Sequence, residues 1–378
     1  MEQVIIGLIA FLAIWGIIAL LYRQLGLSRY GFSLKPFILI VRSKRIAKKL
    51  ETVGISISKP WKLFMNLGVV LSGGLMAFAF YILISNLIVR LTTTTQAGLY
   101  VIIPGLTIGW HVVPYFVLAA AITIIIHEAF HAISFGSERV PIKSFGVFFA
   151  VILPGGLVEA DNEAFNSSKP LSKMRIYASG SFSNFIVFLL AVGLIALTVS
   201  STPNGVLVFD TLEGYPAHGV LKSWDVIISI NGHRVYNVND LDKVLSRIPP
   251  GTRINIEVLR GDDYITVSLI TASNPSNKSK SFMGVDISNY YPSTIPWLKG
   301  QAYWHWVSSL YWLRLVSFSV AIINMLPIPL LDGSGFIKSL LEGLLKNRKR
   351  ANDLIVNLLG SISLFLLLAN IMVPVMRP

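Results

Sequence analysis

The sequence predicts a polytopic α-helical membrane protein with about six transmembrane helices, a short membrane-associated β element and one inserted mixed α/β domain. Hydrophobic residues make up 53% of its 378 residues and charged residues only 13%, and the mean hydropathy is +0.66. Apolar runs long enough to cross about 30 Å of hydrocarbon recur along the chain. This balance is typical of a protein that crosses the lipid bilayer several times, and it argues against a soluble enzyme with a single anchor.

Six apolar runs are the predicted membrane spans. The first of them lacks a basic start and a small-residue cleavage site, so we expect a retained helix and not a removed signal peptide. The runs lie near residues 4–22, 63–90, 110–135, 175–200, 304–326 and 353–374.

Lysine and arginine residues set the predicted orientation of the spans. The segment from Arg23 to Lys62 carries ten of them against the single acid Glu51, so we expect it in the cytoplasm. Basic residues also begin the fourth span and follow the fifth, where the same threading predicts cytoplasm. We therefore expect a multi-pass protein of the cell membrane with both termini outside. Because the net charge of +13 gathers in loops beside the spans, it suits lipid headgroups, and we expect no nucleic-acid partner.

His127, Glu128 and His131 lie late in the third span, in the pattern H-E-x-x-H. Residues four apart share one face of a helix, so the two histidines can offer imidazole nitrogens to one metal, with Glu128 beside them as a general base. Ionisable groups in hydrocarbon are costly unless they are paired or liganded. The chain has no cysteine, so any metal must use His, Asp or Glu. A pair of hydrogen-bonded core histidines, with Glu128 as their partner, is the alternative.

Asp332 is the expected third ligand, because a catalytic zinc usually has three protein ligands and an open fourth position. It is the conspicuous acid within the spans and lies in the segment from Asn324 to Gly333. Two prolines before it break the helix, and Gly333 permits a sharp turn. The predicted topology places it near the cytoplasmic face, at the depth of the histidine pair. A helix cap at the interface is the alternative role for Asp332.

These two motifs together resemble those of the site-2 protease family of intramembrane zinc metalloproteases, in which H-E-x-x-H and N-x-x-P-x-P-x-L-D-G make one zinc site. The resemblance spans residues from about 110 to 340. It implies one zinc ion (Zn2+) per chain, held by His127, His131 and Asp332, with Glu128 as the base. It also implies hydrolysis of a peptide bond in or next to the transmembrane segment of a membrane-anchored protein, near the cytoplasmic face. Such substrates are expected to be trimmed first by another protease, as in regulated intramembrane proteolysis.

Two asparagines are further candidate site residues. The segment from Gly180 to Asn184 is similar to a family G-x-x-x-N segment, although Ser181 stands where a proline often follows the glycine. An amide in a membrane helix needs partners and can donate to a developing oxyanion. We therefore assign Asn184 and Asn324 to stabilisation of the substrate carbonyl or the intermediate, with interhelical hydrogen bonding as the alternative for each. For Gly180 we expect close helix packing.

Residues from about 202 to 290 form the predicted inserted domain, because charges return there and apolar residues alternate between turn signals. Its stretch from Gly214 to Gly232 and its strand from Ile254 to Arg260 resemble a protease-associated PDZ domain, departing from the pattern at Ser223. PDZ domains add an extended peptide to a sheet edge, so an extended peptide is an expected partner. A spacer or plug is the alternative role, and the topology predicts this domain outside the cytoplasm.

The apolar stretch from Gly146 to Leu153 is too short to cross the membrane and is rich in β-forming residues. We expect a β element beside the H-E-x-x-H helix that pairs with a stretched substrate, with a purely structural hairpin as the alternative.

The predicted organisation has five parts. A non-catalytic membrane PDZ adaptor or a transporter is the alternative for the whole chain, but it leaves both motifs unexplained. The parts are an N-terminal membrane region with a basic loop (1–109), a first catalytic part (110–201), the PDZ-like domain (202–290), a second catalytic part (291–340) and a basic loop with the last span (341–378).

Overall fold

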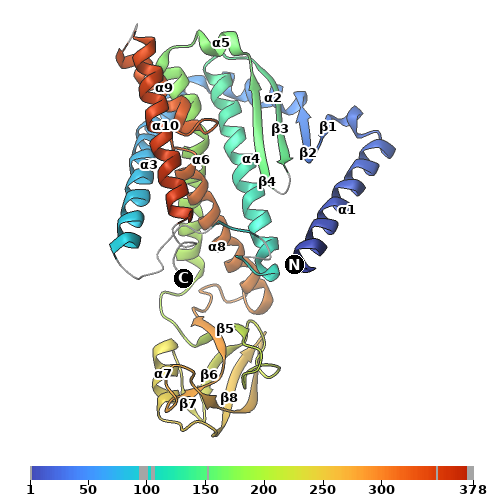
Figure 1. Cartoon of the computed structure of the whole chain (residues 1–378), viewed down its shortest axis with the longest axis vertical. Coiled ribbons are helices and arrows are strands. Elements are labelled where there is room, and N and C mark those ends of the chain that lie inside the picture. The colour runs from blue at the N-terminus through green and yellow to red at the C-terminus, as the bar shows by residue number, and fades with distance from the viewer. Residues whose placement is uncertain (1, 93–100, 104–106, 151–152, 346–347, 373–378) are drawn as a thin grey trace. The chain divides into compact units, whose positions relative to one another are not determined.

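The computed structural model describes residues 2–92, 101–103, 107–150, 153–345 and 348–372 (Figure 1). Its contacts divide the chain into two compact units. The membrane unit comprises Met1–Leu189 and Trp312–Pro378, and the inserted unit comprises Leu190–Tyr311. Each unit has its own hydrophobic core, and the candidate site lies wholly in the membrane unit.

Five helices within the described residues are long and apolar enough to cross a membrane. The sixth predicted span, near residues 4–22, forms α1 (Glu2–Gln24). Within α1, the part from Leu12 to Gln24 is apolar but shorter than the five helices that could cross a membrane. The end of the predicted 353–374 span lies outside the described residues. The five helices are α3 (Ser58–Thr92), α4 (Val113–Ser137) with the short 3-10 turn before it (Trp110–Val112), α6 (Pro170–Thr198), α8 (Gly300–Ile323) and α10 (Lys349–Met372).

Shorter helices connect and brace these spans. The amphipathic helix α2 (Lys44–Ser56) packs on α4 at glycines, because a Cβ on Gly54 would lie 2.2 Å from the Ile133 carbonyl oxygen. A Cβ on Gly136 of α4 would lie 2.4 Å from the Glu51 carbonyl oxygen of α2. A side chain at Gly54 or Gly136 would therefore push the two helices apart, and α2 fixes the end of α4 that carries the H-E-x-x-H motif. The others are a 3-10 turn (Leu27–Tyr30), α5 (Asn162–Asn166) and α9 (Asp332–Leu345).

The membrane unit contains a four-stranded antiparallel sheet in the order β1-β2-β3-β4, which Figure 1 shows beside α4. Its strands are β1 (Phe32–Lys35), β2 (Ile38–Ser43), β3 (Ile142–Ala150) and β4 (Leu153–Ala160). The expected β element at residues 146–153 is present, but most of it belongs to β3, which is paired on both sides and so is not free to pair with a substrate. The edge strands among the described strands are β1 and β4, and β4 is the edge strand that contacts α4.

The inserted unit is built on an antiparallel sheet in the order β12-β5-β6-β8-β9, with β7 pairing β6. Buried aliphatic residues from these strands form its core, against which α7 packs through Leu241 and Leu245. The elements are β5 (Val206–Thr211), β6 (Val226–Ile230), β7 (His233–Arg234), α7 (Val238–Ser246), β8 (Arg253–Arg260), β9 (Asp263–Ile270) and β12 (Val285–Asn289), with a separate pair β10 (Ala272–Ser273) and β11 (Ser281–Phe282).

Candidate metal centre

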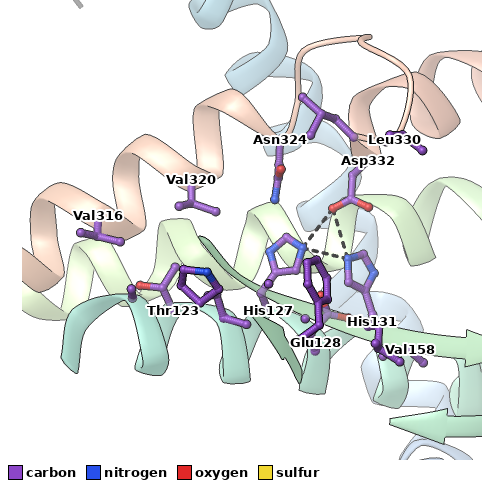
Figure 2. A pocket seen from close by; sticks show the side chains of 18 of the residues that line it. Thr123, His127, Glu128, His131, Val158, Val316, Val320, Asn324, Leu330 and Asp332 are labelled. Carbon is purple, nitrogen blue, oxygen red and sulfur yellow. Dashed lines mark hydrogen bonds and ion pairs between the residues drawn. The ribbon is translucent and has the colours of Figure 1, made fainter. Parts of the chain in front are cut away.

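Three side chains from α4 and α9 bring one potential ligand atom each to a single point (Figure 2). His127 Nε2 lies 3.1 Å from His131 Nε2, and Asp332 Oδ2 lies 3.2 Å from the first nitrogen and 3.1 Å from the second. Both imidazoles are buried and Asp332 is half-buried. Among the residues that the structure describes, this is the one group of His, Asp or Glu whose potential ligand atoms gather in this way.

The spacing of these atoms fits a zinc ion. A tetrahedral zinc with bonds of about 2.0–2.1 Å holds its ligand atoms roughly 3.3–3.4 Å apart, close to the distances between the three atoms here. Two imidazoles and one carboxylate are also ligand types that zinc takes in catalytic sites. The residues present therefore fit a zinc ion with a fourth position open.

The backbone between α8 and α9 delivers Asp332 to the histidines. Helix α8 ends at Ile323, and a proline-containing turn leads into α9, whose first residue is Asp332. Gly333 N donates to the Asn324 carbonyl oxygen over 2.7 Å, which closes the turn. A Cβ on Gly333 would lie 2.2 Å from the Met325 carbonyl oxygen, so only glycine permits this close approach. The expected broken helix is thus present, and its glycine serves close packing in addition to the turn.

Helix α6 holds the far sides of both imidazole rings. His131 Nδ1 lies 2.8 Å from the Ile176 carbonyl oxygen, and His127 Nδ1 lies 2.9 Å from the Asn184 side-chain nitrogen. With their Nδ1 atoms occupied on α6, both rings turn Nε2 towards Asp332. Contacts of this kind fix the orientation of metal-binding histidines.

Gly180 makes this approach of α6 to α4 feasible. A Cβ on Gly180 would lie 2.4 Å from both His127 Nε2 and His131 Nε2. The flanking residues Ser179 and Ser181 are also small and fully buried. A row of small residues therefore lets the backbone of α6 pass directly behind the two rings.

A cavity of about 750 Å³ opens beside the three ligand atoms. Its wall is formed mainly by α4, α6, α8, the α8–α9 turn, β3 and β4, and it includes Glu128 and Asn324. Most of the lining is apolar, with Val316 and Val320 on one side and Val158 on another (Figure 2). An apolar cavity with a few convergent polar groups is typical of a binding or active site.

Glu128 and Asn324 are the polar cavity residues next to the histidine pair. A Cβ on Gly156 of β4 would lie 2.1 Å from Glu128 Cγ, so this strand touches the side chain of the expected base. The Asn324 side chain points towards His127 in Figure 2 and makes no hydrogen bond to another described residue. Its amide is therefore available to a bound molecule, whereas that of Asn184 is engaged by His127.

A family sequence model matches more than half of the chain. The sequence model of peptidase family M50 matches residues 115–369, which include the H-E-x-x-H helix, the inserted domain and Asp332. The chain belongs to peptidase family M50. Like other members of this family, which includes the site-2 proteases, it is a membrane-embedded metalloprotease, and the family implies zinc as its metal.

Individual relatives of this M50 peptidase include two named as proteases. It is 30% identical to a membrane-bound transcription factor site-2 protease homologue of Arabidopsis thaliana, over 39% of this chain and 32% of that protein. It is 23% identical to a Clostridium perfringens protein named as a zinc metalloprotease, over 68% of this chain and 94% of that one. An uncharacterized protein of Methanocaldococcus jannaschii is 26% identical over 90% of this chain and 87% of its own length.

The inserted domain has its own likeness to solved structures. The PDZ domain of an SdrC-like protein from Listeria monocytogenes is 20% identical and covers 24% of this chain and 93% of that chain, with a TM-score of 0.22.

Sequence reasoning missed three residues that shape the site. Gly156 touches Glu128, the Ile176 carbonyl faces His131, and Leu330 lines the cavity two residues before Asp332. Leu330 has a φ of +78° and is fully exposed, an unusual pairing for a leucine. The Pro-Gly-Gly run at the start of β4 was a signal of a close backbone approach, but nothing in the sequence identified Glu128 as its partner.

Proposed function

We propose that this M50 peptidase hydrolyses a peptide bond in or next to the transmembrane segment of membrane-anchored proteins. One zinc ion is held by His127, His131 and Asp332. The observation that carries this proposal is the triangle of ligand atoms, 3.1–3.2 Å on each side, opening into an apolar cavity of a membrane unit.

The residues around the triangle suit hydrolysis of an amide. When bound, zinc supplies a Lewis acid that polarises a carbonyl and lowers the pKa of water towards about 7. Glu128, whose side chain lines the same cavity, accepts the proton of the attacking water at its carboxylate and returns it to the nitrogen of the leaving amine. Asn324, with its amide unengaged, donates a hydrogen bond to the oxygen of the carbonyl under attack.

Strand β4 is the proposed binding edge for the substrate. A transmembrane helix hides its carbonyl groups in its own hydrogen bonds, so the segment to be cut must first become extended. Residues Pro154–Val158 of β4 line the cavity, and β4 pairs only with β3 among the described strands. An extended segment paired with this edge would pass Gly156, and so would lie next to Glu128.

The proposed setting is the cell membrane, with the site nearer its cytoplasmic face. The positive loops before α3, before α6 and after α9 support this orientation, which puts the PDZ-like domain and both termini outside. In this setting the substrate is trimmed first by another protease, and the PDZ-like domain binds an extended peptide. The cut then releases a fragment inward.

Metal content and cleavage measured together test this function. We expect about one zinc per purified full-length chain, and cleavage of a membrane-anchored test protein in detergent micelles or nanodiscs. Glu128→Ala should keep the zinc and lose cleavage, because it removes the base but no ligand. Asp332→Ala should lower both.

Two outcomes would overturn the assignment. Cleavage retained in Glu128→Ala would exclude Glu128 as the base, and unchanged zinc in Asp332→Ala would mean that another residue is the third ligand. Leu344→Ala, on an exposed face of α9, is the matched control and should leave both measurements unchanged.

A further inference from the structure

We infer that Asn184 is a positioning residue for His127: its side-chain oxygen accepts a hydrogen bond from the ring Nδ1–H and so presents Nε2 to the metal. This role replaces the expected one, in which Asn184 donates to the substrate. The inference rests on the proposed zinc site and deepens it.

The surroundings of Asn184 contain an unpaired acceptor. Its side chain is completely buried, and its nitrogen lies 2.9 Å from His127 Nδ1. Its oxygen Oδ1 is buried as well and has no hydrogen-bond partner among the residues that the structure describes. Buried polar atoms in folded proteins are nearly always paired, so an unpaired oxygen beside an imidazole indicates a second arrangement of this amide.

Metal binding requires that second arrangement. An imidazole that gives its Nε2 lone pair to a metal carries its proton on Nδ1, which is then a donor and needs an acceptor. The amide nitrogen that now faces Nδ1 can only donate, so it suits the other tautomer, in which the proton sits on Nε2. Rotating the amide of Asn184 by half a turn exchanges nitrogen and oxygen at almost no change in shape. The rotation places Oδ1 against Nδ1–H and moves the amide nitrogen to the position that the oxygen now holds.

His131 already has an acceptor at its Nδ1, and this acceptor cannot be exchanged for a donor. His131 Nδ1 lies 2.8 Å from the Ile176 carbonyl oxygen, which can only accept. His131 is therefore committed to a proton on Nδ1 and a free lone pair on Nε2. Ile176 and Asn184 lie two turns apart on α6, so one helix supplies the acceptor for each ring.

The position of Asn184 outside the cavity argues against a direct contact with substrate. The described residues that line the cavity include Asn324 but not Asn184. An amide that stabilises an oxyanion must reach the reacting carbonyl, and Asn184 is on the far side of the His127 ring. Asn324 is placed for that task, and Asn184 is placed to hold a ligand.

Zinc affinity is the decisive measurement. Competition with a chromophoric chelator gives the zinc dissociation constant of the full-length protein in nanodiscs. We expect Asn184→Leu to weaken zinc binding by about 10–100-fold, the usual effect of losing a hydrogen bond to a ligand. Asn184→Asp keeps an acceptor and should bind zinc within about threefold of the wild type. In the cobalt-substituted protein, Asn184→Leu should also change the visible absorption of the metal.

A matched control separates this role from the loss of any buried amide. Asn370 in α10 is also completely buried with an unpaired Oδ1, but its amide donates to the Leu83 and Leu366 carbonyls. Asn370→Leu should leave the zinc dissociation constant unchanged, even if it lowers the melting temperature.

Two results would contradict the positioning role of Asn184. Wild-type zinc affinity in Asn184→Leu, or Asn184→Asp with unchanged zinc but abolished cleavage, would overturn the positioning role. If Asn184→Leu does not fold, Asn184→Asp alone decides the matter. Failure of the proposed function is a different result, because it would appear in the wild type as absent zinc or in Glu128→Ala as retained cleavage.

Discussion

Gly156 on β4 lies against Glu128 on α4, where a Cβ on the glycine would be 2.1 Å from Glu128 Cγ and 2.5 Å from its Oε1. Gly156→Ala must therefore displace either the strand or the carboxylate. We expect a loss of at least about tenfold in kcat/KM for a membrane-anchored test protein, because a shift of a catalytic group by about 1 Å can cost a hundredfold. Zinc content should stay near the wild-type level, since Gly156 touches no ligand.

Gly155 provides the comparison for that prediction. It precedes Gly156 on the same strand, but its added methyl group would meet the ring of Phe148 and not Glu128. Gly155→Ala should cost less cleavage than Gly156→Ala. Equal losses in the two variants would mean that the strand as a whole, and not the contact with Glu128, carries the effect.

Gly180→Ala should lower the affinity for zinc. The added Cβ would lie 2.4 Å from both His127 Nε2 and His131 Nε2, so the rings must move apart from α6. Overpacking of this kind costs about 1–3 kcal/mol and also disturbs the ligand geometry. We expect zinc affinity to fall at least about tenfold, as measured by chelator competition. Gly193→Ala in the same helix meets nothing within 4 Å and should bind zinc normally, and normal binding by both variants would contradict the packing argument.

The candidate ligand set could be predicted from the sequence because each half of it is local. His127 and His131 are one turn apart, so any helix there places them together. Asp332 was the conspicuous acid in the spans, the predicted topology gave it the same depth as the histidines, and the prolines and Gly333 around it allow the chain to turn towards them. The side-chain partners of the rings were not accessible in this way, because rotation of α6 about its axis decides whether Asn184 faces a cavity or a histidine.

The β sheet could not be foreseen for a related reason. Strand β2 pairs with residues of β3 that lie more than 100 positions later, and the Arg42–Glu159 ion pair joins positions 117 apart in sequence. Alternation identifies a strand but says nothing about which distant strand pairs with it. The sequence therefore indicated a β element at 146–153 but assigned the free edge to that stretch, when the pairing leaves it on β4.

Leu330 is expected to contact the substrate, and its strained backbone lowers the free energy of unfolding. Its φ of +78° costs a leucine about 1–2 kcal/mol, and its fully exposed side chain regains nothing from packing. Asparagine adopts this backbone conformation readily, so Leu330→Asn should raise the free energy of unfolding by about 1 kcal/mol. Cleavage should fall about tenfold if an apolar substrate segment contacts Leu330 at the cavity wall.

Arg139 is the control for the backbone effect. It also has a positive φ, +62°, but lies in an exposed turn away from the cavity. Arg139→Asn should gain stability with no change in cleavage. Unchanged cleavage in Leu330→Asn would remove Leu330 from the substrate path.

The sheet beside α4 should weaken in acid through Glu159. A hydrogen bond from Ser144, followed by the charge of Arg42, lowers the pKa of the Glu159 carboxyl below its ordinary value. A carboxyl with a lowered pKa in the folded state stabilises that state above its ordinary pKa, and this contribution is lost as the pH falls through the lowered value. The pair is partly exposed, so its contribution is about 0–1 kcal/mol.

Glu159→Gln removes this titration and tests its sign. Above a pH of about 5 the variant should be less stable than the wild type. The difference should shrink as the pH falls below the ordinary pKa of glutamate, because the unfolded state then binds the proton first, and it should vanish once the folded carboxyl is protonated too. Thermal unfolding of both proteins across this range measures the difference directly. A gap that widens in acid would mean that the contact with Ser144 and Arg42 favours the protonated carboxyl, opposite to the direction that the geometry of the three strands implies.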